Sequence, residues 1–154
     1  MIRDYEMELT VDGGHDVSDI GNNATVYGSR PYDLKAAGVN VHLGEKLTML
    51  GQVLTADVDT ATSIAFTLVT DTDGAGAGAV ALHEPVVKAI ADLQVADGVF
   101  IIAVIPGNTA VKRYLTARMV SVGEPGGTGT VKVWLVKGDV AIPHNAGWNT
   151  TAAP

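Results

Sequence analysis

The sequence has 154 residues, a length that suits one domain with a single core. It contains no cysteine, which excludes disulfide frameworks, thiolate metal sites and thiol nucleophiles. Its 17 acidic and 10 basic residues give a net charge of -7 and form no basic cluster, so nucleic-acid binding through phosphate contacts is not expected.

The first 45 residues are dense in turn signals. Glycine, asparagine, aspartate and proline cluster at residues 12–16, 21–23 and 28–31, too closely for long helices or strands to fit between them. We therefore expect residues 1–45 to form an extended N-terminal arm and an irregular edge segment. The opening residues mix charged and apolar types, so we expect no secretory signal and synthesis in the cytoplasm.

From residue 46 onward, apolar and polar residues alternate with a period of two, which is typical of β-strands. β-Branched and aromatic residues fit such half-buried strands. The low charged fraction, 18%, and the 18 glycines also favour a turn-rich all-β protein. This alternation predicts strands at residues 46–54, 62–70, 112–122 and 130–137. Residues 99–105 are apolar on both faces and end at a proline-glycine turn signal, which predicts a strand buried between two layers.

Residues 79–95 have a mixed pattern. Their apolar residues nearly match helical spacing, but Pro85 would interrupt a helix that began at Val80. We therefore predict two short strands, at residues 79–84 and 89–95.

Short strands at this spacing favour an all-β fold, as a two-sheet antiparallel sandwich or jelly roll. Its body is expected to span residues 46–140, and residues 141–154, rich in small and turn-forming residues, form a C-terminal tail. The longest apolar run, residues 99–105, is far too short to span a bilayer, so no membrane partner is expected.

A glycine and alanine stretch at residues 74–79 follows a predicted strand and fits the relaxed GxGxxA form of a dinucleotide-binding loop. However, Asp71 and Asp73 would place negative charge beside a pyrophosphate, and Pro85 interrupts the helix that such a site requires. The same aspartates suggest calcium, but an EF-hand count fails at two ligand positions. We interpret the stretch as a flexible surface loop between sheets.

The remaining polar residues form no recognisable catalytic or metal-binding grouping. The histidines lack HExxH and paired-histidine spacing, and no serine lies in a GxSxG motif. The carboxylates of Asp57 and Asp59 flank a predicted turn without a supporting partner. We therefore expect no enzyme activity, no cofactor and no metal site. The four histidines are His15, His42, His83 and His144.

Tyr114 and Trp134 lie on the more polar faces of their predicted strands. One interpretation is that each fills an edge of the core. The other is that they belong to a contact surface, because partly exposed tryptophan, tyrosine and arginine are enriched at protein interfaces. Both interpretations are compatible with the sequence.

Several segments spread over most of the chain carry a resemblance to a known family. They are the opening Met1-Ile2-x-Asp4 and residues 64–70, 93–98, 112–115 and 129–136. The most specific part runs from Arg113-Tyr114-Leu115 to Gly129-Thr130. On these segments the chain resembles the small jelly-roll cement, or decoration, proteins that coat the heads of tailed bacteriophages. It departs from them in its first 45 residues, which are longer, more acidic and richer in glycine.

The resemblance implies a non-enzymatic virion protein that binds the outside of the assembled head and stabilises contacts between major capsid subunits. It also implies self-association, as a dimer or trimer on a symmetry axis of the capsid. We expect contact residues on strand faces and in the arm, namely Arg3, Tyr5, Arg113, Tyr114 and Trp134.

A carbohydrate-binding β-sandwich module is the alternative from another functional class. In that case Trp134, Tyr114 and Trp148 would form an aromatic platform for a sugar. The exposure of Trp134 and a glycan array distinguish the two. An enzyme ranks third, because catalytic motifs are missing.

Overall fold

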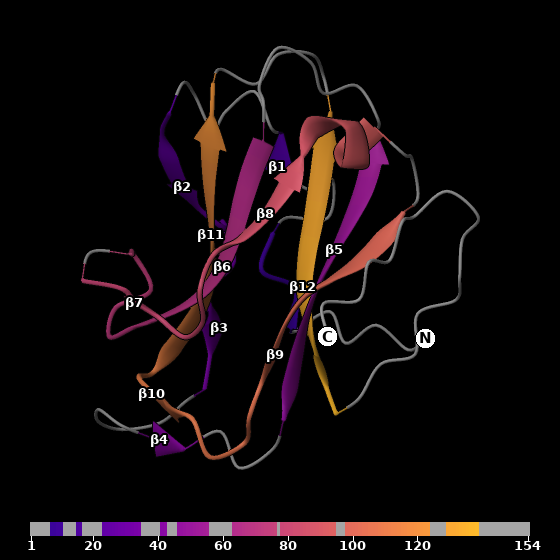
Figure 1. The fold of residues 1–154 in the computed structure, drawn as a ribbon. Coiled ribbons are helices and arrows are strands. Elements are labelled where there is room, and N and C mark those ends of the chain that lie inside the picture. The colour runs from indigo at the N-terminus through magenta and orange to yellow at the C-terminus, as the bar shows by residue number, and fades with distance from the viewer. Residues whose placement is uncertain are drawn as a thin grey trace.

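The computed structural model describes residues 7–10, 15–16, 23–34, 41–42, 46–55, 63–76, 78–94, 98–123 and 129–138. Over these residues the chain forms a sandwich of two antiparallel sheets around one core (Figure 1). The all-β sandwich predicted from the sequence is confirmed. In this part of the chain, no helix has the length and apolar character needed to cross a membrane.

Four strands form the first sheet, in the spatial order β1 (His15–Asp16), β12 (Thr130–Lys137), β5 (Leu47–Thr55) and β9 (Val99–Ile105). β12 and β5 pair along almost their whole length. A register shift between β5 and β9 leaves Ile102 without an opposite residue, which is the geometry of a β-bulge.

The second sheet has β11 (Tyr114–Val122) and β6 (Ser63–Asp71) at its centre. β11 pairs with β6 along one edge, and along its opposite edge it pairs with β2 (Thr25–Tyr27) and β3 (Tyr32–Asp33). Along its edge away from β11, β6 pairs with β7 (Val80–Ala81) and β8 (Val86–Ala89). A separate ribbon joins β4 (Val41–His42) to β10 (Ala110–Val111).

The chain passes between the two sheets in a defined order. If β1, β2, β5, β6, β8, β9, β11 and β12 are counted from first to eighth, the first sheet holds the first, eighth, third and sixth strands. The second sheet holds the second, seventh, fourth and fifth. This is the strand order of a jelly roll.

The predicted arm is described only in part, and the predicted tail lies outside the described residues. Within residues 1–45, β1 supplies an edge of the first sheet, and β2 and β3 supply an edge of the second. Residues 1–6, which include Arg3 and Tyr5, lie outside the described residues, as do residues 139–154.

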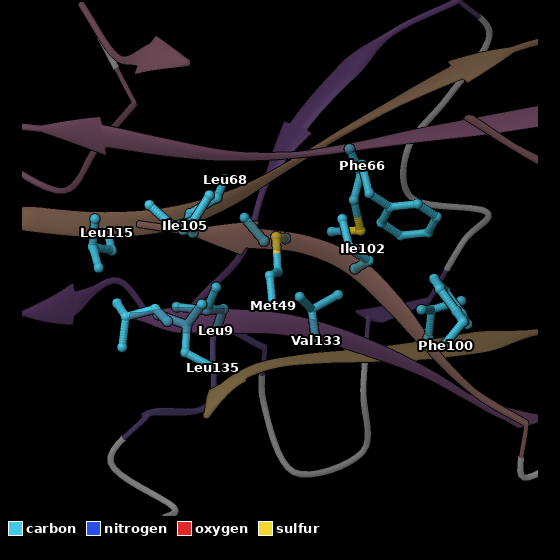
Figure 2. Close-up of a cluster of buried hydrophobic side chains, with 14 of the residues drawn as sticks. Leu9, Met49, Phe66, Leu68, Phe100, Ile102, Ile105, Leu115, Val133 and Leu135 are labelled. Atoms are coloured by element: carbon cyan, nitrogen blue, oxygen red, sulfur yellow. The ribbon is translucent and has the colours of Figure 1, made fainter. Parts of the chain in front are cut away.

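The core lies between the sheets, because every second residue of a strand faces inward. Buried aliphatic and aromatic side chains from both sheets meet there (Figure 2). The labelled members include Leu68 and Leu115 of the second sheet and Met49, Val133 and Leu135 of the first.

Two phenylalanines contact each other across the sandwich. Phe66 of β6 and Phe100 of β9 meet edge to face, with ring centroids 5.6 Å apart. Gly51 on β5 makes room for this pair, because a Cβ atom there would lie 2.5 Å from the Phe100 ring.

The five predicted strands all occur, with bounds within two residues of those expected. The expectation that residues 99–105 are buried on both faces is wrong, because Ile101 and Val104 of β9 are exposed. The bounds predicted within residues 79–95 are wrong. β7 is only two residues long, and after β8 the chain forms the 3-10 helix η3 (Ile90–Gln94). β8 ends at Ala89 because its partner β6 begins at Ser63, directly opposite. Leu93 of η3 is then buried in the core.

His83 fills the gap between β7 and β8 on the edge of β6. Its Nε2 accepts a hydrogen bond from the Leu68 amide at 2.9 Å, and its Nδ1 lies 2.6 Å from the Glu84 carbonyl oxygen. Nε2 must therefore hold the lone pair while Nδ1 carries the proton. His83 is a structural residue, because its side chain accepts a hydrogen bond from the backbone of β6 at a place where neither β7 nor β8 pairs with that strand.

Candidate functional site

Two of the residues expected in an interface lie side by side on the second sheet. Tyr114 begins β11 with its side chain on the outer face, directly opposite Asp33 of β3 and Asp71 of β6. Arg113 precedes it, and its guanidinium carbon lies 5.0 Å from the centre of the Tyr114 ring. The two side chains therefore form one stacked unit.

Arg113 is paired with a carboxylate of its own chain. Its Nε donates to Oδ1 of Asp33 at 2.9 Å, and Nη2 donates to Oδ2 at 2.8 Å. These hydrogen bonds and the charge attraction of Asp33 raise the pKa of Arg113 above its usual value. The bidentate pair fixes the guanidinium above Tyr114, although both partners stay partly exposed.

A loop of small residues packs against the same surface. We call residues 72–76 and 78–79 the glycine loop. Gly74 and Gly76 have φ of +77° and +84°, in the left-handed region that suits glycine. A Cβ atom on Gly74 would lie 3.1 Å from the Pro31 ring, and one on Gly76 would lie 2.7 Å from the Tyr27 ring. Only glycine lets the backbone approach these rings so closely.

The Asp71 carboxylate holds the glycine loop closed. Its Oδ1 accepts from the Thr72 amide at 2.6 Å and its Oδ2 accepts from the Gly76 amide at 2.7 Å. Burial raises the pKa of Asp71, but the hydrogen bonds to the charged form outweigh it, so the pKa lies below its usual value. Asp73 likewise accepts from the Ala75 amide at 2.9 Å. Both carboxylates are therefore engaged with the loop backbone.

The far end of the glycine loop is tied to the chain just before β11. Lys112 Nζ donates to the Gly78 carbonyl at 3.0 Å, while the Lys112 amide donates to Oγ1 of Thr70 at 2.7 Å. The same hydroxyl donates to the Tyr114 carbonyl at 3.1 Å. The interpretation of this stretch as a loop between sheets is wrong, because it joins β6 to β7 within the second sheet.

Two further residues of the outer face, Thr116 and Arg118, were not predicted as site residues from the sequence. Thr116 and Arg118 follow Tyr114 at intervals of two and therefore share its face of β11. Thr116 is fully buried, and its hydroxyl has no hydrogen-bond partner within the described structure. The same holds for the Nε of Arg118, a half-buried residue. Alternation along β11 groups these residues with Tyr114, but it does not reveal that they are unpaired.

Trp134 lies on the other sheet and is buried. It is on the outer face of β12, opposite Leu50 of β5, with only 1% of its surface exposed. The expectation of an exposed contact residue is therefore wrong for Trp134. Alternation correctly predicted which face it occupies, but alternation does not report whether that face is covered.

A buried ion pair lies beside Trp134. Glu8 forms a β-bridge with Trp134, and its Oε1 lies 2.6 Å from Nζ of Lys132. Arg30 is more distant, with Nη1 3.8 Å from Oε2 of Glu8. These contacts attach residues 7–10 to the edge of β12, where the Leu9 amide also donates to the Val133 carbonyl at 2.9 Å.

The structure thus groups Arg113 with Tyr114 and separates both from Trp134, which faces outward from the opposite sheet. Arg3, Tyr5 and Trp148 lie outside the described residues. Within the described ranges, no cluster of histidine, aspartate and glutamate is placed to hold a metal ion. No protein-family model and no curated protein sequence matches the chain.

Proposed function

We propose that this chain is a capsid cement protein, which binds the outside of an assembled phage head and stabilises contacts between major capsid subunits. The proposal rests on the family resemblance of the sequence and on one structural observation. Arg113 and Tyr114, expected at the interface, are held together in a fixed arrangement on one outer face. Aromatic and arginine anchors that are ordered before binding lose little entropy when a partner docks.

The energetics of this role require binding to the assembled shell and not to separate subunits. Each bound copy then stabilises the shell by about 2.7 kcal/mol when the free protein is at a hundred times its Kd. Because a head offers many equivalent positions, modest affinity at each site adds up over the lattice. A two-sheet sandwich is a suitable body for this function, since it limits the number of exposed strand edges.

Self-association, as a dimer or trimer, is part of the proposal, and β9 is the surface that supports it. β9 is the last strand of its sheet within the described residues, and it carries no charged residue. Its register shift places Ile101 and Val104 on the same outer face, with 41% and 48% of their surfaces exposed. The chain has a net charge of -7, and an uncharged strand adds no charge repulsion of its own at the place where a second copy docks.

The proposed function is tested by adding the purified protein to heads that lack it and sedimenting the mixture. We expect binding that saturates at a fixed number of copies per capsid subunit, and heads that withstand a higher temperature. An Arg113→Ala variant should bind more weakly, whereas Lys137→Ala, which removes the same charge from the opposite sheet, should bind like the wild type. Protein that stays in the supernatant at all concentrations contradicts the proposal.

The carbohydrate-binding alternative finds no support in the described residues. An aromatic sugar platform needs exposed rings that face the same way. Trp134 is buried, and Tyr114 faces outward from the other sheet. A glycan array that shows specific binding would revive this alternative.

A further inference from the structure

The outer face of the second sheet carries a row of uncharged side chains that crosses four strands. β2, β11, β6 and β8 lie side by side in this sheet (Figure 1), and residues directly opposite each other on neighbouring strands share a face. The row consists of Thr25, Val120, Ala65 and Val87. The next row, at the end of β11, consists of Val122, Ser63 and Ala89. We call these seven positions the uncharged end.

The uncharged end is accessible and mainly apolar. Val87 and Val122 have 61% and 52% of their surfaces exposed, and Ala89 is exposed as well. Lys88 does not interrupt this surface, because it points to the other side of the sheet, where its Nζ lies 5.3 Å from the centre of the Phe100 ring. Exposed apolar side chains that form one patch mark a binding surface on a folded protein.

The middle of the same face is closed to a partner. Thr116 and Val69, which lie opposite each other there, have no exposed surface. The glycine loop also packs on this face, because a Cβ atom on Gly76 would lie 2.7 Å from the ring of Tyr27. The accessible parts of the face are therefore its two ends, the uncharged end and the end that holds Arg113 and Tyr114.

Both accessible ends belong to one surface of ordinary interface size. Tyr114 is the first residue of β11 and Val122 is the last. Nine residues of a strand span about 27 Å, and four strands span about 14 Å. Since a standard interface covers about 800 Å² on each partner, a protein that contacts Arg113 and Tyr114 over a footprint of that size also reaches the uncharged end. Such interfaces combine an apolar part with tyrosine and arginine contacts.

We propose that the uncharged end docks on an apolar patch of the major capsid protein, so that the docking surface extends over β11 from Tyr114 to Val122. This inference rests on the proposed function, which supplies the partner. A second copy is a poorer occupant, because the surface proposed for self-association, β9, belongs to the other sheet. Copies related by a symmetry axis normal to the shell turn one and the same face towards it.

The uncharged end is tested with heads that lack the protein. Val87→Lys and Val122→Lys each place a charge in the apolar contact. Each should weaken head binding by roughly 10-fold or more, since burying one valine corresponds to about that factor. Val80→Lys is the matched control, because Val80 is also 52% exposed but lies opposite Thr70, on the other side of the sheet. It should bind like the wild type.

A second pair of variants separates binding from folding. Val87→Thr and Val122→Thr keep the β-branched shape that suits a strand, and both positions are exposed. Both variants should unfold at the wild-type temperature and bind heads a few-fold more weakly. If a lysine variant fails to fold, the threonine variant at that position decides, and wild-type binding by it rejects the inference.

Sedimentation velocity of the isolated variants identifies the occupant. We expect Val87→Lys and Val122→Lys to associate like the wild type. A shift of either variant towards the monomer would show that a second copy covers this face, and would overturn the assignment to the capsid protein.

Failure of this inference can be told apart from failure of the proposed function. If the wild type binds heads and the variants of Val87 and Val122 bind equally well, the uncharged end lies outside the interface and the inference alone is rejected. If the wild type does not bind heads at any concentration, the capsid function is rejected, and the inference with it.

Discussion

The carboxylate of Asp71 accepts a hydrogen bond from the amide of Gly76, five residues later in the chain, at 2.7 Å. This bond, together with that from the Thr72 amide, closes the glycine loop on the outer face of the second sheet. A single acidic side chain therefore determines the local shape of the surface that contains Tyr114.

The first prediction concerns the pH dependence of stability. The pKa of Asp71 is lower in the folded protein than in the unfolded chain, because the loop hydrogen bonds favour the charged form although burial opposes them. Its stabilising effect is therefore complete above the unfolded value of about 3.9 and is lost as the pH falls through the folded pKa. Urea unfolding between pH 6 and pH 2.5 should show this loss in the wild type and a weaker dependence in Asp71→Asn.

At neutral pH, Asp71→Asn should lower the free energy of unfolding by about 1–3 kcal/mol, because an amide cannot accept both loop hydrogen bonds. Asp73→Asn is the matched control, since Asp73 is exposed and accepts one bond from Ala75. An equal loss in both variants would contradict the role assigned to Asp71.

The second prediction uses two glycines with the same backbone conformation. Gly76 and Gly78 have φ of +84° and +82°, but only Gly76 lies against a ring, that of Tyr27. Gly78→Ala should lower the free energy of unfolding by about 1–2 kcal/mol, which is the cost of holding alanine in the left-handed backbone conformation. Gly76→Ala should lower it further, because its Cβ atom would lie 2.7 Å from Tyr27. Thermal unfolding of both variants measures the difference, and equal melting temperatures would show that the ring contact is unimportant.

The third prediction concerns the buried pair of Glu8 and Lys132, whose side chains are 1% and 6% exposed. Glu8→Gln should lower the free energy of unfolding by about 3–5 kcal/mol, because it leaves the Lys132 charge buried without its partner. Lys132→Met in the Glu8→Gln background should restore much of that loss. A double-mutant cycle measured by urea unfolding gives the coupling energy, and additive effects would mean that the two charges do not interact.

The fourth prediction separates stability from binding at Arg113. Its side chain is 47% exposed and that of Asp33 is 31% exposed, so solvent screens the ion pair and it should contribute little to folding. Arg113→Ala should therefore unfold at nearly the wild-type urea concentration while binding heads more weakly. A large drop in stability would indicate that the pair is structural, and normal head binding would remove Arg113 from the interface.

The fifth prediction tests self-association through β9. Ile101→Lys places a charge on the uncharged strand edge and should shift the protein towards the monomer in sedimentation velocity. Val122→Lys, at an exposed apolar position on the second sheet, should leave the association unchanged. The β9 surface would be excluded if both variants sedimented like the wild type.

Much of the fold could be predicted from the sequence, because the signal is local. In β6, Ile64, Phe66 and Leu68 face the core and alternate with Ala65 and Thr67, and a period of two is a property of any strand, whatever its neighbours are. The end of β8 could not be predicted, since it depends on where its partner strand begins.

The site was less predictable, because it depends on contacts between distant parts of the chain. Arg113 and Arg118 look alike in the sequence, yet Asp33, 80 residues away, occupies only the first. Trp134 was assigned to the correct strand face, but its burial depends on what covers that face.

The central claim, that this protein binds an assembled phage head, is tested most directly by cryo-electron microscopy of particles from a phage that encodes it. The account predicts sandwich-shaped density on the outside of the head, at positions that repeat with the capsid lattice, with the β11 face towards the major capsid protein. Heads without such density, from lysates in which the protein is found only in the free fraction, would contradict it.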